Sequence, residues 1–91
     1  MRVGLAFASS VSIDGASTIE ICKRAEQAGF ESVWGGEHVV RPDDIESPYP
    51  YTKDGKIPME PDTPVPDPLI WLAYASAVAP TLRLGTCILI V

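Results

Sequence analysis

Three short apolar runs divide the chain. Residues 3–8 are almost wholly apolar, residues 32–36 carry Val33 and Trp34, and residues 82–91 read LRLGTCILIV. Short apolar runs of this kind are typical of parallel strands that are buried on both faces. We therefore predict a strand at each of the three positions.

A helical pattern over residues 16–28 lies between the first two runs. Apolar and small residues recur there at helical intervals and predict one narrow inner face, formed by Thr18, Ile21, Cys22, Ala25 and Ala28. Asp14 or Ser17 can cap the start, and Ser17 with Glu20 has the capping-box spacing. Gly29 is placed to end the helix in the left-handed conformation, with Phe30 folding back onto it.

A second helix is predicted over residues 69–79. Asp67 is a suitable N-cap and Pro68 suits the first helical position, while Pro80 ends the pattern. The helix is apolar almost all round, which favours burial between layers. Strands alternating with single helices indicate parallel pairing in the order 1-2-3, so the fold class is α/β in one domain.

The segment between the second strand and the second helix is a long loop. Residues 41–66 show little periodicity and contain seven prolines, together with Tyr49 and Tyr51. Long loops inside compact domains are usually functional or disordered. The acidic run at residues 43–46 lacks the spacing of a calcium-binding loop and is interpreted as solvated.

Composition narrows the function. The 91 residues suffice for one small core, and the net charge of -5 with scattered basic residues argues against a nucleic-acid partner. No apolar run approaches the roughly 20 residues that span a bilayer, so we expect no membrane association and a cytoplasmic location. Cys22 and Cys87 are expected to be reduced, packed thiols, and no metal site is expected.

Glu37 and His38 form the sharpest chemical signal in the chain. They follow the second predicted strand, and in parallel barrels the carboxyl ends of the strands hold the active site. His38 is the only histidine, and its imidazole can hydrogen-bond a ligand or transfer a proton. The residues alone leave open the alternative of a loop histidine satisfied by a backbone group.

Three stretches together resemble one family. They are residues 25–38 (AEQAGFESVWGGEH), 46–58 (ESPYPYTKDGKIP) and 67–91 (DPLIWLAYASAVAPTLRLGTCILIV). The chain resembles the luciferase-like monooxygenase superfamily, in particular its branch that uses the deazaflavin coenzyme F-420. The resemblance implies a (β/α)8 TIM barrel, of which residues 1–91 would be an N-terminal part truncated after the third strand, since a complete barrel needs about 250 residues.

The resemblance also implies an activity. The full protein would transfer hydride between coenzyme F-420 and a small organic substrate, with FMN and oxygen as the alternative chemistry. The resemblance places Glu37 and His38 at the reactive face of the cofactor. Small residues at the end of the first strand could leave room for its flat ring at Ala6, with tight barrel packing as the alternative. The chain alone is expected to be inactive.

Two further groups follow from the resemblance. The turn formed by Thr86, Cys87 and Ile88 would press against the back of the ring through a non-proline cis bond at Cys87–Ile88, which costs about 3–4 kcal/mol. The alternative is an ordinary buried strand. Tyr49 and Tyr51 would close over a substrate, or they would only attach the loop to the body.

The residues are also compatible with two other classes of function. A different barrel enzyme could use Glu37 and His38 as metal ligands, although adjacent residues of an extended chain diverge. A non-catalytic module could associate through the unpaired edge of the third strand. Because three strands bury little surface, we expect an isolated chain that is poorly stable or self-associates, which leaves a homo-oligomer open.

Overall fold

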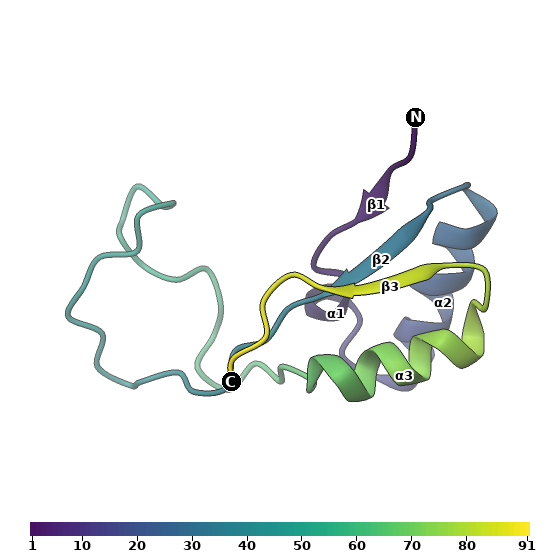
Figure 1. Ribbon diagram of the computed structural model, residues 1–91. Helices are drawn as coiled ribbons and strands as arrows, with labels where there is room; N and C mark the ends of the chain where they lie inside the picture. Colours follow the sequence, from purple (N-terminus) through teal and green to yellow (C-terminus); the bar gives the residue numbers. More distant parts are fainter.

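Three parallel strands lie side by side in the order β1-β2-β3 (Figure 1). The computed structural model describes residues 1–91. The strands are β1 (Gly4–Leu5), β2 (Ser32–Gly35) and β3 (Arg83–Thr86), and the helices are α1 (Ala8–Val11), α2 (Gly15–Gln27) and α3 (Pro68–Val78). The predicted α/β class, parallel pairing and strand order are confirmed.

Helix α2 begins one residue before the predicted start. The Asp14 carboxylate accepts the Ser17 N–H at 2.7 Å, and the Asp14 N–H donates to the Ser17 hydroxyl at 3.4 Å. The predicted capping box of Ser17 with Glu20 is therefore wrong, because Asp14 stands at the N-cap and Ser17 is already its third helical residue. Gly29 ends the helix with a φ of 85°, as predicted, and Phe30 donates its N–H to the Ala25 carbonyl at 3.0 Å.

The core lies between the sheet and helices α2 and α3. It contains nine buried apolar residues: Ala8, Cys22, Ala25, Val33, Trp71, Leu72, Ala75, Ala79 and Leu82. The Trp71 indole N–H donates to the Ser12 carbonyl at 3.0 Å and to the Thr18 hydroxyl at 3.1 Å. Helix α3 is thereby connected to the start of α2 by both apolar packing and hydrogen bonds.

Helix α3 begins as predicted but buries only one side. The Asp67 carboxylate accepts the Ile70 N–H at 2.9 Å, and Pro68 occupies the first turn. The outer side leaves Leu69 55% and Ile70 73% exposed. The prediction that this helix is buried between two layers is therefore wrong, because no second layer covers its outer side. Ala28, which was predicted to belong to the inner face of α2, follows the last residue of that helix and is also exposed.

Two strands are shorter than predicted. Residues 3–8 give only β1, because Phe7 adopts a φ of 53° and turns the chain into α1. Residues 82–91 give only β3, which ends at Thr86. Thr86 pairs with Gly35, the last residue of β2, so the partner strand stops there and residues 87–91 lie exposed.

The sheet face opposite the helices is occupied by Trp34. Its indole N–H donates to the Ser32 hydroxyl at 2.9 Å, and the ring is 40% exposed. A Cβ atom at Gly85 would lie 2.5 Å from the indole ring, and one at Gly4 would lie 2.8 Å from its Nε1. Glycines on both neighbouring strands therefore provide the space in which the indole lies across the sheet.

The loop of residues 36–67 projects beyond the carboxyl ends of the strands (Figure 1). It contains no helix or strand but has its own turn. The Tyr49 N–H donates to the Gly55 carbonyl at 2.7 Å, and Gly55 has a φ of 69°. The loop is therefore ordered by local hydrogen bonds. No helix of the chain is long and apolar enough to cross a bilayer.

Both cysteines are free. Cys22 is buried, and this burial raises the pKa of its thiol. Cys87 is exposed, so the prediction that it is packed is wrong. The reason is again the early end of β3, which leaves Cys87 outside the sheet.

Candidate functional site

The carboxyl ends of the three strands meet at one edge of the sheet. Ala6 follows β1, Glu37 and His38 come soon after β2, and Cys87 follows β3 directly. The Cys87 N–H donates to the Gly35 carbonyl at 2.7 Å, which continues the pairing of β2 with β3 by one bond. This edge is where parallel barrels hold their active sites.

Ser9 fixes the start of the loop to this edge. Its side chain is fully buried, and its hydroxyl accepts the Gly36 N–H at 3.1 Å. The bond ties helix α1, which follows β1, to the residue after β2. Sequence analysis missed Ser9, although a hydroxyl residue soon after the first strand was a usable signal.

Glu37 joins the segments that follow β2 and β3. It is half-buried, and its carboxylate accepts the backbone N–H of Ile90. No hydrogen bond connects Glu37 to His38. The contact with Ile90 keeps the end of the chain beside the start of the loop, as Figure 1 also shows.

His38 is exposed and borders two hollows under the loop. One, of about 200 Å³, is also lined by Glu37 and Asp67, and the other, of about 290 Å³, by Arg41 and Thr63. The imidazole makes no hydrogen bond to the protein. Both of its nitrogens are therefore available to a ligand that enters either hollow.

The turn after β3 departs from the prediction. Thr86 is half-buried, while Cys87 is exposed and Ile88 is 51% exposed. All peptide bonds of the chain are trans, so a cis bond at Cys87–Ile88 is not present. A cis bond persists only where packed surroundings enforce it, and residues 87–91 lie exposed. The alternative, an ordinary strand with Gly85 for close packing, holds for Gly85 and Thr86, which are half-buried in β3, but not for Cys87 and Ile88.

The two loop tyrosines lie apart from this edge. Tyr49 is half-buried and Tyr51 is 85% exposed, and their rings meet edge to face with centroids 5.5 Å apart. Neither lines the hollows beside His38. Ala6, His38 and Thr86 thus lie along the carboxyl edge of the sheet, whereas the tyrosines lie in the loop, and neither Ala6 nor Thr86 lines the hollows beside His38.

No group of three or more histidine, cysteine, aspartate or glutamate side chains lies close enough to hold a metal ion. The polar groups at the strand ends are instead an imidazole, a hydroxyl and one carboxylate that is already hydrogen-bonded.

A comparison with known protein families identifies the family of this chain. The family model described as luciferase-like monooxygenase matches residues 1–91. The chain belongs to the luciferase-like monooxygenase family. Comparisons with curated proteins and with solved structures each gave no match.

Luciferase-like monooxygenases are flavin-dependent oxidoreductases built on a TIM barrel. The parallel sheet of this family member has the strand direction and order that such a barrel requires, although three strands leave it open. The family predicted from the sequence is confirmed, and the gathered strand ends correspond to the functional edge of that fold.

Proposed function

We propose that residues 1–91 form the first three strands of a coenzyme F-420-dependent oxidoreductase and one wall of its coenzyme site. The observation that supports this most is the position of Ala6, His38 and Thr86 along the carboxyl edge of the sheet, in a chain of this family. The reaction would transfer hydride between the deazaflavin and a small organic substrate. FMN is the alternative cofactor.

The chemistry of this edge fits a flat ring with polar atoms along one side. Ala6 is exposed and carries only a methyl group, so a planar group can approach the end of β1 closely. The Thr86 hydroxyl and the His38 imidazole make no hydrogen bond to the protein and can donate to ring oxygens or nitrogens. A bound deazaflavin supplies the hydride, while the protein supplies orientation and electrostatics.

Each side chain has a distinct role in this proposal. The His38 imidazole hydrogen-bonds the ring or substrate and moves a proton at one of its nitrogens, because an imidazole can both donate and accept a proton. Glu37 is a positioning residue, since its carboxylate holds the Ile90 backbone and keeps the two strand-end segments together.

Binding is tested first, by fluorescence titration of the chain with F-420 and with FMN. We expect F-420 to bind more tightly, and we expect His38→Ala and Thr86→Val to weaken it. Arg24→Ala is the control, because Arg24 is exposed on α2 and pairs only with Glu20. Tighter binding of FMN, or no effect of either variant, would contradict the F-420 proposal.

Turnover is tested in a complete barrel that carries these residues. We expect His38→Ala to lower kcat by about 10²–10⁴-fold, the usual contribution of a general acid or base, with little change in melting temperature because the ring is exposed. Glu37→Gln should have a smaller effect. Full activity combined with a melting temperature several degrees lower would show His38 to be structural.

A second candidate function rests on the outer edge of β3. This strand pairs only with β2, so its other side offers unpaired backbone groups for association with a second copy or another subunit. Sedimentation of the chain over a range of concentrations tests this. A monomer at all concentrations would exclude self-association through that edge.

A further inference from the structure

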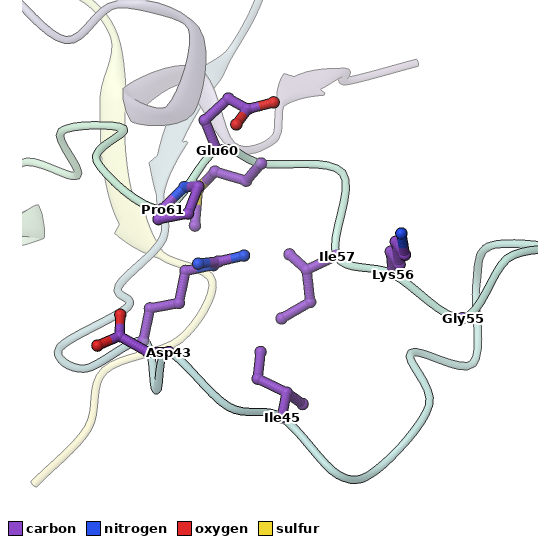
Figure 2. Close-up of a pocket in the computed structure, with 9 residues that line it drawn as sticks. Asp43, Ile45, Gly55, Lys56, Ile57, Glu60 and Pro61 are labelled. Carbon is purple, nitrogen blue, oxygen red and sulfur yellow. The ribbon is translucent and has the colours of Figure 1, made fainter.

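A separate hollow of about 330 Å³ lies within the loop (Figure 2). Its lining includes Arg41, Ile45, Lys56 and Ile57. Arg41, Met59 and Pro61 also line the neighbouring hollow that reaches His38. The loop therefore offers two adjoining spaces, with Arg41 between them and the imidazole at the far side.

Arg41 is the unusual side chain of this hollow. Its Nε is shielded from solvent and has no hydrogen-bond partner, and no other buried side-chain nitrogen or oxygen of the chain lacks one. Buried polar groups are nearly always hydrogen-bonded, and each exception asks for an explanation such as a missing ligand. The only ion pairs of the chain are Arg24 with Glu20 and Arg83 with Glu31, so Arg41 also lacks a carboxylate partner.

The walls of the hollow favour an organic anion. Figure 2 shows the side chains of Ile45 and Ile57 pointing toward one another across the space. The carboxylates of Asp43 and Glu60, which also line it, point away from its centre. A ligand there meets hydrocarbon on two sides and the unpaired guanidinium of Arg41.

The backbone around Lys56 is already fixed by the loop turn. The Lys56 N–H donates to the Asp54 carboxylate at 3.1 Å, and the Lys56 carbonyl accepts the Thr52 hydroxyl at 2.8 Å. Its side chain forms no ion pair and adds a second positive charge to the lining. This wall of the hollow is therefore formed before any ligand arrives, which lowers the entropic cost of binding.

We propose that the hollow binds the carboxylate of an organic acid, which is the substrate. Arg41 is its counter-ion, because a guanidinium matches carboxylate geometry, and the two isoleucines pack against the hydrocarbon part. The remainder of the substrate extends through the adjoining hollow toward His38. The identity of the acid as substrate and its extension toward His38 rest on the proposed function, whereas carboxylate binding at Arg41 does not.

The test is a titration of the chain with hexanoate, followed by NMR at the arginine Nε–H signals. We expect the Arg41 signal to shift with hexanoate and not with hexanamide, which has the same shape without the charge. Arg41→Gln should raise the Kd for hexanoate about tenfold or more, the loss expected for one charge-assisted hydrogen bond. Arg24→Gln is the matched control and should leave the Kd unchanged.

Three outcomes would overturn the proposal. Equal shifts with hexanoate and hexanamide, or an unchanged Kd in Arg41→Gln, would show that Arg41 does not bind the carboxylate. A loss of F-420 affinity in Arg41→Gln as large as the loss for hexanoate would assign the hollow to the coenzyme instead of the substrate. Failure of the wild-type chain to bind F-420 would contradict the proposed function and leave the hexanoate result standing.

Discussion

The β/α body (residues 4–35 and 68–86) and the loop (residues 36–67) are held together by different forces. All nine core residues lie in the body, and none lies in the loop. The loop instead relies on prolines and on turn hydrogen bonds such as that from Tyr49 to Gly55. Regions with so different a share of buried apolar contacts open with different free energies, so we expect the loop to loosen while the body stays folded.

The largest effect should come from the core of the body. Trp71→Ala removes a side chain that is 4% exposed, and we expect the free energy of unfolding to fall by about 3–5 kcal/mol. Trp71→Phe should cost less, because it keeps most of the packing and loses only the hydrogen bonds to Ser12 and Thr18. Urea denaturation followed by circular dichroism measures both.

Tyr74→Ala on the same helix is the control for this experiment. Tyr74 is 42% exposed, and its removal should cost much less. Equal losses for Trp71→Ala and Tyr74→Ala would mean that α3 is not held by its inner side.

The junction between the two regions comes next. Ser9→Ala leaves the buried Gly36 N–H without its acceptor, which costs about 1–3 kcal/mol. We expect faster hydrogen exchange at Gly36 and lower stability of the body. Ser10→Ala, an exposed neighbour on α1, should change neither quantity. Unchanged exchange at Gly36 in Ser9→Ala would show that the bond does not fix the loop.

The same substitution, glycine to alanine at a positive φ, can be made in each region. Gly29 has a φ of 85° in the body and Gly55 a φ of 69° in the loop. Alanine in this conformation costs about 1–2 kcal/mol. We expect Gly29→Ala to lower the global free energy of unfolding by that amount. Gly55→Ala should leave the global free energy of unfolding unchanged and speed hydrogen exchange around Tyr49. A lower global free energy of unfolding in Gly55→Ala would show that the loop and the body unfold together.

The smallest effect on the free energy of unfolding is expected from a fall in pH. The Ser17 backbone N–H lowers the pKa of Asp14, and the Lys56 backbone N–H lowers that of Asp54, both below the ordinary value of 3.8. On acidification the unfolded carboxyl takes up its proton first, so stability is fully present above pH 3.8 and falls as the pH drops from there through the lower folded pKa.

Asparagine variants separate the two carboxylates in this acid range. Asp14→Asn should flatten the acid dependence of global unfolding, because Asn still caps a helix but does not titrate. Asp54→Asn should affect only exchange in the loop. Thermal melts between pH 5 and pH 2 measure the first effect, and an unaltered slope in Asp14→Asn would contradict it.

Prediction from the sequence succeeded where structure depends on nearby residues. The cap at Asp67, the helix end at Gly29 and the parallel strand order follow from local spacing and from the chirality of β/α crossovers. Strand lengths failed because they depend on the partner. Thr86 is the last paired residue only because β2 stops at Gly35, and nothing in residues 82–91 reveals that.

The candidate site was predictable only in part. Position after a strand pointed to Glu37 and His38, whereas Thr86, which ends β3, was selected only through the family resemblance. The bond between Ser9 and Gly36 spans 27 positions, and the burial of Arg41 depends on the path of the whole loop. Contacts of that kind arise from tertiary structure and leave no periodic signal in the sequence.

The two tryptophans report on opposite faces of the sheet. Trp71 on α3 is buried against the start of α2. Trp34 instead lies beside Gly4 and Gly85 on the uncovered face of the sheet. Acrylamide should quench the emission of Trp34 and spare that of Trp71. Any further strand, subunit or ring compound that covers the open face would shift the Trp34 emission alone, so the protein carries its own optical marker for the completion of its barrel.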